Sequence, residues 1–210
     1  MPLLLLCILL FLGSAILTGL FRWIALRIQL IAVPVSRSAH SRPVPVAGGV
    51  SIVTLILLVV AYSYFTDRIP ANEFAALMAG LVIAFIGIVD DIKQLDVRWR
   101  IPAQFLVSIY VVYCLGDVPA IDFGLFSLPE SIVLNVMAVF ALVWLLNLYN
   151  FMDGIDGIAA TQLIAVNLVS LVIVINSDAV LTLLSASFAA AAGGFLLWNW
   201  APAKIFMGDV

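Results

Sequence analysis

Seven long apolar runs constrain this chain more than any other feature of its sequence. They cover residues 3–20, 47–65, 70–89, 101–115, 131–149, 157–176 and 179–198. A helix needs about 20 apolar residues to cross the hydrocarbon core of a bilayer. Strands of a membrane barrel are excluded because their segments alternate over only about 10 residues. The sequence therefore predicts an all-α, polytopic transmembrane helical bundle of about seven spans, forming one domain over residues 1–210.

The composition agrees with a membrane-embedded chain. Hydrophobic residues make up 65% of the sequence and charged residues 10%, against about 45–50% and 25% in soluble domains. Too few polar residues are present to cover a water-facing surface. A soluble enzyme, a nucleic-acid-binding protein and a disordered chain are therefore excluded, and the lipid bilayer is the first expected partner.

The basic residues predict the orientation of the bundle. Eight of the nine lie in loops on one side of the spans, and only Arg68 lies on the other. The eight are Arg22, Arg27, Arg37, Arg42, Lys93, Arg98, Arg100 and Lys204. Because cytoplasmic loops are enriched in Lys and Arg, we expect the N-terminus outside and the C-terminus in the cytoplasm.

An aspartate pair, Asp90–Asp91, ends the third run on the basic side. Carboxylates at a helix C-terminus oppose the helix dipole, at about 0.3–1 kcal/mol each. A cation would relieve this cost and the repulsion between the two neighbours. The pair therefore indicates a Mg²⁺-linked or phosphate-activating site, with Lys93, Arg98 and Arg100 near enough to receive an anion. The alternative is an acidic cap at the membrane interface.

A second polar pattern closes the fifth run. Asn147, Asn150, Asp153 and Asp156 recur every three residues, which on a helix would place them on one face. Such groups are costly at membrane depth unless they are paired or line a cavity. The pattern predicts a pocket for a nucleotide or diphosphate, and the alternative is a seam of hydrogen bonds between helices.

Two further segments face the same side. Lys204 and Asp209 flank a short apolar stretch near the end of the sequence. The loop before the second run carries Arg37, His40 and Arg42, which could bind phosphate beside a helix N-terminus. For His40 an ordinary loop histidine is the alternative.

These segments resemble a known family in four matches that occur in the right order. They are the loop RSAHSRPVPVAGG at 37–49, the pair Asp90–Asp91, NLYNFMDGIDG at 147–157 and IFMGD at 205–209. The chain resembles the polyprenyl-phosphate N-acetylhexosamine-1-phosphate transferases (glycosyltransferase family 4), relatives of the phospho-MurNAc-pentapeptide translocase. The basic loop is most similar to bacterial members that initiate O-antigen or related glycans.

The resemblance implies transfer of a sugar 1-phosphate from a UDP-sugar to undecaprenyl phosphate, with release of UMP. It implies Mg²⁺, or alternatively Mn²⁺, and a site on the cytoplasmic face of a bacterial inner membrane. It assigns catalytic roles to Asp90, Asp91, Asp153 and Asp156, and metal contacts to Asp91 and Asp209. It implies substrate binding by Asn147, Asn150, Arg37, His40, Arg42, Lys93 and Lys204.

One departure from the family pattern concerns the end of the sequence. Family members continue past the Met-Gly-Asp match with further helices and a basic, His-containing loop, whereas this sequence stops at Val210. We therefore expect a C-terminally truncated chain that inserts into membranes but does not catalyse transfer alone. The alternatives are a non-catalytic remnant and a lipid or solute transporter or flippase, although transporters usually hold ionisable groups near the bilayer midplane.

Overall fold

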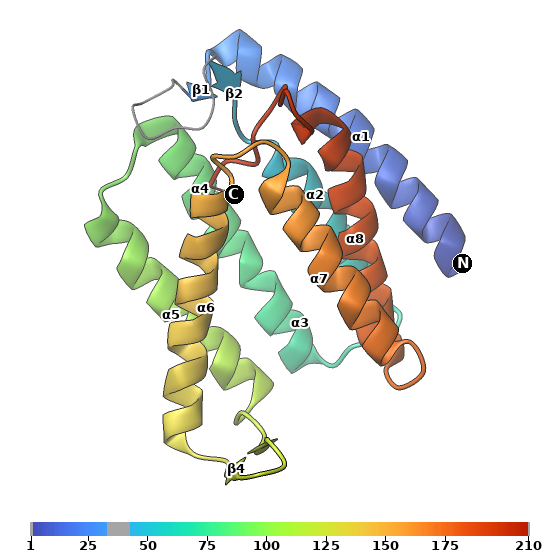
Figure 1. Cartoon of the computed structure of the whole chain (residues 1–210), viewed down its shortest axis with the longest axis vertical. Coiled ribbons are helices and arrows are strands. Elements are labelled where there is room, and N and C mark those ends of the chain that lie inside the picture. The colour runs from blue at the N-terminus through green and yellow to red at the C-terminus, as the bar shows by residue number, and fades with distance from the viewer. Residues whose placement is uncertain (1, 33–42, 210) are drawn as a thin grey trace.

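The computed structural model describes residues 2–32 and 43–209. Within these residues the chain forms eight helices (Figure 1). They are α1 (Leu3–Ile28), α2 (Gly49–Phe65), α3 (Ala71–Met78), α4 (Gly80–Lys93), α5 (Val97–Leu115), α6 (Ile132–Met152), α7 (Ile158–Val174) and α8 (Ala179–Asn199). Each predicted run coincides with a helix, and the third is divided into α3 and α4. The prediction of an all-α membrane-type fold is confirmed.

Four of the described helices are long and apolar enough to cross a membrane. They are α1, the continuous stretch Ala71–Lys93 that joins α3 and α4, α6 and α8. The helices α2 and α7 are apolar but shorter. Helix α5 begins earlier than the apolar run predicts, because the Asp96 side chain accepts the Arg98 N–H at 3.0 Å and caps the helix.

The main core lies where α8 packs between α1 and α7, with α2 behind (Figure 1). Its buried apolar residues include Leu10, Ile52, Val60 and Phe195. Small residues along α8 let the neighbouring backbones approach closely, as is typical of membrane helices. The segment after α8 therefore starts from a closely packed group of helices.

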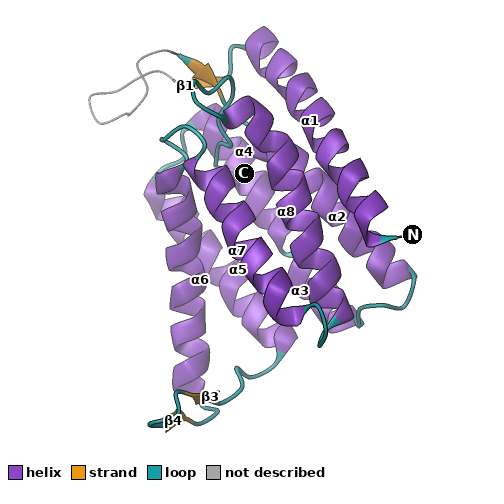
Figure 2. Cartoon of the chain, turned by 45° about the vertical axis from the view of Figure 1, so that its right-hand side comes forward, coloured by secondary structure: helices purple, strands orange, loops and turns teal. Residues whose placement is uncertain are grey.

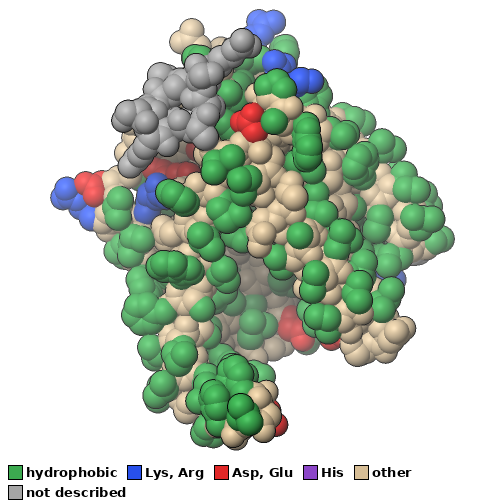
Figure 3. Space-filling model, viewed as in Figure 1, with side chains coloured by type: hydrophobic (Ala, Val, Ile, Leu, Met, Phe, Trp, Pro, Cys, Tyr) green, Lys and Arg blue, Asp and Glu red, His purple; other side chains and the backbone are tan. Residues whose placement is uncertain are grey.

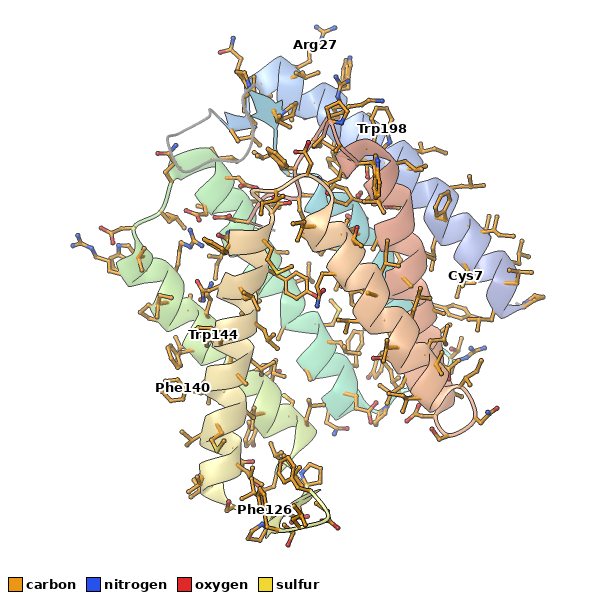
Figure 4. All side chains as sticks on the ribbon, in the orientation of Figure 1. Cys7, Arg27, Phe126, Phe140, Trp144 and Trp198 are labelled. Carbon is orange, nitrogen blue, oxygen red and sulfur yellow. The ribbon has the colours of Figure 1, made fainter. Side chains whose placement is uncertain are left out.

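Helices α5 and α6 pack against each other on the other side of the molecule. The Phe140 and Trp144 side chains of α6 (Figure 4) are 60% and 71% exposed, although the Phe140 ring also contacts Phe105 of α5 edge-on. Hydrophobic side chains cover most of the face shown in Figure 3, while Lys and Arg side chains gather mainly at its upper end. This distribution is expected for helices surrounded by lipid.

Two short antiparallel strand pairs, which the sequence did not predict, lie at opposite ends of the bundle (Figure 2). Strand β3 (Ile121–Asp122) pairs with β4 (Ser127–Leu128), and β1 (Ile31–Ala32) pairs with β2 (Val44–Pro45). The Phe206 N–H donates to the Pro45 carbonyl at 2.8 Å. The Gly48 N–H in turn donates to the Phe206 carbonyl at 2.9 Å. Strand β2 and the start of α2 therefore position the segment after α8.

Candidate active site

The acidic clusters meet at one end of the bundle, although they are far apart in the sequence. Asp90 and Asp91 lie in the last turns of α4, and Asn150 lies near the end of α6. Asp153 follows α6 directly, and Asp209 belongs to the segment after α8. The C-terminus lies beside the ends of α4 and α6 in Figure 1.

Asp153 fastens the last segment to the end of α6. Its Oδ1 accepts the Met207 N–H at 3.0 Å, and its Oδ2 accepts the Gly208 N–H at 2.8 Å. Gly208 has a positive φ of 81°, and a Cβ there would collide with the Asp91 carboxylate. Only glycine suits this position, because it tolerates both the backbone conformation and the close approach.

Asp156 lies beyond the helix on which the sequence analysis placed it. Helix α6 ends at Met152, with Asp153 as its C-cap, so the three-residue spacing shares a helix face only for Asn147 and Asn150. Glycines at 154 and 157 favour the turn that follows. The Asp156 Oδ2 accepts the Ala203 N–H at 3.0 Å and so also binds the segment after α8.

Arg100 joins two of the acidic residues. Its Nη1 forms ion pairs with Asp90 Oδ2 and, at 3.1 Å, with Asp209 Oδ2. The other Asp209 oxygen accepts a hydrogen bond from Asn150 Nδ2. The sequence analysis did not separate Arg100 from the neighbouring cations. One feature of the sequence could have distinguished it. Arg100 and Gln104 are four residues apart, so both polar side chains lie on the same face of α5.

Asp91 presents an oxygen that nothing among the described residues satisfies. Its Oδ1 accepts the Asp209 N–H at 3.1 Å. Its Oδ2 is buried and has no hydrogen-bond partner there. Buried polar atoms are nearly always paired in folded proteins. This oxygen therefore indicates a ligand position.

The site carries more negative than positive charge. Burial, more than any other cause, raises the pKa of Asp153 to about 7, against the hydrogen bonds from Gly208 and Met207. Burial likewise raises the pKa of Asp209 to about 7, and the neighbouring Asp90 side chain adds to the effect while Arg100 opposes it. A proton or a cation would relieve the cost of burying these carboxylates.

Two carboxylates of the cluster carry oxygen donors of the kind that bind Mg²⁺. Among the described residues, no three His, Cys, Asp or Glu side chains are grouped to hold a metal ion. Mg²⁺ is commonly bound by one or two carboxylates together with phosphate oxygens and water. Asp91 and Asp209 carry hard oxygen donors of that kind, and Asp91 Oδ2 has no hydrogen-bond partner among the described residues.

A polar cavity opens beside an apolar groove at this place. The cavity has a volume of about 40 Å³, and its polar lining consists of Asp90, Arg100, Gln104, Asn150 and Asp209. The groove, of about 220 Å³, is lined mainly by apolar side chains of α4 and α6 and reaches Asn150 and Asp209. The two hollows share Ile83, Leu146, Asn150 and Asp209. Charged groups therefore lie at the end of a groove suited to hydrocarbon.

The remaining predicted site residues lie outside this cluster or outside the described residues. Asn147 does not line the polar cavity. Its Nδ2 donates a hydrogen bond at 2.7 Å to Oε1 of Gln104, which does. Lys93 is exposed in the last turn of α4, and the Lys204 ammonium lies over the Trp198 ring. Residues 37, 40 and 42 (Arg37, His40 and Arg42) fall outside the described part of the chain. Their roles in substrate binding stay predictions.

Comparison with known proteins identifies the family. The pattern of glycosyl transferase family 4 matches residues 73–210, which include every residue of the acidic cluster. The chain belongs to glycosyl transferase family 4. Family members therefore share the stretch of sequence that forms α3 to α8 and the segment after it.

Several curated proteins are similar to this chain, and the names of the first two include a polyprenyl phosphate. A probable undecaprenyl-phosphate N-acetylglucosaminyl 1-phosphate transferase of Bacillus subtilis is 31% identical over 92% of this chain and 54% of its own length. A decaprenyl-phosphate N-acetylglucosaminephosphotransferase of Mycobacterium leprae is 31% identical over 91% of this chain and 53% of its own. A phospho-N-acetylmuramoyl-pentapeptide-transferase from Wolbachia is 31% identical over 84% of this chain and 58% of its own length. The chain thus spans about half the length of the curated relatives it matches.

Proposed function

We propose that the protein to which this chain belongs transfers an N-acetylhexosamine 1-phosphate from a UDP-sugar to undecaprenyl phosphate. The reaction releases UMP and starts a lipid-linked cell-surface glycan at the cytoplasmic face of a bacterial inner membrane. The names of the relatives support the prenyl phosphate and the N-acetylglucosamine 1-phosphate group that is transferred. The positive-inside pattern of Lys and Arg supports the orientation.

One observation carries the proposal: the charged cluster lies at the end of an apolar groove. A prenyl phosphate joins a long hydrocarbon chain to a charged head, and this arrangement matches both parts. Arg100 and Asn150 provide donors beside the groove, while Asp91 and Asp209 provide oxygens for a cation. A transporter would need no such cluster at helix ends on one face of the bundle.

The chemistry asks the chain mainly for positioning and charge neutralisation. An oxygen of the acceptor phosphate forms a bond to the β-phosphorus of the UDP-sugar, and the bond from that phosphorus to the bridging oxygen breaks. UMP leaves with the bridging oxygen. Mg²⁺, when bound at Asp91 and Asp209, would neutralise diphosphate charge. Arg100 faces the acceptor phosphate, and Asp153 holds the backbone of residues 207–208 so that Asp209 stays in place.

The test is UMP release from UDP-N-acetylglucosamine and related UDP-sugars by a membrane preparation containing the protein, with undecaprenyl phosphate and Mg²⁺ supplied. Release should require both the lipid and the cation. Asp209→Asn should lower it by about 10²-fold or more, because a metal ligand is lost. Asp122→Asn, at the other end of the bundle, is the control and should keep nearly full activity. Equal loss in both variants, or release without the lipid, would refute the proposal.

A further inference from the structure

Arg100 occupies the carboxylate to which the proposed function assigns a metal ion. Both oxygens of Asp209 are engaged, one by Asn150 Nδ2 and the other by Arg100 Nη1 at 3.1 Å. The same Nη1 also pairs with Asp90 Oδ2. A divalent cation can bind Asp209 fully only when Arg100 releases it.

Burial makes this ion pair strong enough to compete. The Arg100 side chain is 21% exposed, that of Asp209 is 25% exposed and that of Asp90 is 5% exposed, so water screens these charges less than it screens charges on an open surface. The neighbouring Arg98 differs sharply. Its side chain is 75% exposed, and both its Nε and its Nη2 bind Asp96 at 2.8 Å. Within the described part of the chain, Arg100 is the cation paired with the site.

We propose that Arg100 substitutes for the divalent cation in the substrate-free site and moves to a substrate phosphate when the cation binds. The inference rests on the proposed function and concerns the regulation of that same site. In the free protein the guanidinium neutralises Asp90 and Asp209 and holds the last segment in place. An arriving acceptor phosphate offers the guanidinium an alternative anion, which frees Asp209 for the metal.

This exchange couples the metal to the substrate. The cation binds weakly while Arg100 holds Asp209, and more tightly once phosphate oxygens attract Arg100 and complete the metal's ligand set. Removing the Arg100 charge therefore has two opposite effects. The affinity of the substrate-free protein for divalent cations increases, whereas transfer decreases. A residue that merely supports the fold would lower both.

The experiment measures Mn²⁺ binding to the purified chain in detergent by electron paramagnetic resonance, with no substrate present. Arg100→Gln should bind Mn²⁺ about ten-fold more tightly than the wild type, since a single close charge typically shifts ionic equilibria by that factor or more. Arg98→Gln removes the same charge two residues away and should leave the affinity unchanged. Arg100→Lys keeps the charge and should stay closer to the wild type than to Arg100→Gln.

Arg100→Gln leaves Asp90 buried without its counter-ion, so a second variant guards against misfolding. The double variant Asp90→Asn/Arg100→Gln removes both charges and leaves Asp209 free, and it too should bind Mn²⁺ more tightly than the wild type. Affinity that is unchanged or weaker in both variants, with the wild type binding Mn²⁺, would overturn the inference. UMP release by the wild type would show that the proposed function survives that result. Absence of Mn²⁺ binding in every variant would overturn the inference and the proposed metal ligands together.

Discussion

Two aspartates of the site, Asp153 and Asp91, use their oxygens differently. Asp153 accepts hydrogen bonds from two backbone N–H groups, so neither oxygen is without a partner. Asp91 keeps Oδ2 without a partner among the described residues. Asp153 is therefore suited to hold the segment at 207–208, and Asp91 is suited to contact a ligand.

Asp153→Asn should loosen the last segment. An amide has one oxygen, so its nitrogen would face one of the two N–H donors at 207 and 208. We expect a loss of about 1–3 kcal/mol in the free energy of unfolding and about 10²-fold in transfer, because catalytic groups would be displaced. Unfolding in detergent and UMP release measure the two effects. Asp122→Asn is the matched control, since Asp122 accepts one N–H in an exposed turn. An Asp153→Asn protein as stable as that control would contradict the assignment.

The raised pKa values of Asp153 and Asp209 predict a stability that depends on pH. Both values lie near 7, above the usual range of an aspartate. The folded state therefore binds more protons than the unfolded state between about pH 4 and 7, and stability falls as the pH rises through this window. The charge of the nearby Asp91 also affects both pKa values, and the charges of Asp90 and Arg100 affect the pKa of Asp209. In the presence of a chelator, the apparent unfolding temperature should be higher at pH 5 than at pH 8.

Added Mg²⁺ should oppose this fall in stability with rising pH. Because the cation binds ionised carboxylates, added Mg²⁺ should raise the unfolding temperature more at pH 8 than at pH 5. Asp209→Asn should weaken the response. An equal response at both pH values would show that the stabilisation does not come from these carboxylates.

Sequence identified the acidic residues but not their partners. The basic loops predicted that Asp90, Asp91, Asp153 and Asp209 lie on one side of the membrane. The hydrogen bonds from Met207 and Gly208 to Asp153 depend on the path of the segment after α8, which hydropathy does not describe. The Arg100 ion pairs likewise depend on how α5 is rotated about its axis relative to α4.

Helices α1 and α8 approach each other closely at Gly194. A Cβ at this position would lie 2.8 Å from Ser14 Cβ and 2.9 Å from Ala15 N, and it would collide with the Phe11 carbonyl. The backbones of both helices would have to move apart to accept a side chain. The packing of this pair therefore depends on the absence of a side chain at Gly194.

Gly194→Ala should destabilise the protein by about 1–3 kcal/mol, as overpacking of a well-packed core does. Circular dichroism during unfolding in detergent measures the change. Gly80→Ala is the matched control, because a Cβ at Gly80 meets nothing within 4 Å. There the substitution should be neutral or slightly stabilising, since alanine favours a helix over glycine. Equal effects of the two substitutions would rule out close packing as the cause.

Hydropathy located the helices well and their ends less well. Each apolar run became a helix, because a chain in lipid must satisfy its backbone hydrogen bonds within the segment. The start of α5 at Val97 was missed because Arg98 and Arg100 interrupt the apolar run, although the Asp96 cap extends the helix through them. The end of α6 at Met152 was missed because the polar spacing continued past it.

The orientation of the whole molecule can be tested by labelling single cysteines after Cys7 and Cys114 have been replaced. A cysteine at Gln94 lies at the end of the bundle that carries the acidic cluster, and one at Ser177 lies in the loop between α7 and α8. With the basic loops in the cytoplasm, a membrane-impermeant reagent added outside intact cells should label Ser177→Cys and not Gln94→Cys. The opposite pattern would invert the topology and exclude a cytoplasmic UDP-sugar site.

The segment after α8 closes the site, and this has a consequence for biosynthesis. The Asp91 carboxylate and the Asp209 N–H that it binds are separated by 118 positions. At about 5–20 residues per second, a ribosome needs roughly 6–24 s to travel between them. During that interval Asp91 and then Asp153 have been synthesised, while the backbone donors that will bind them have not been made. The nascent protein therefore passes through a stage in which these carboxylates are present and the segment that binds them is not.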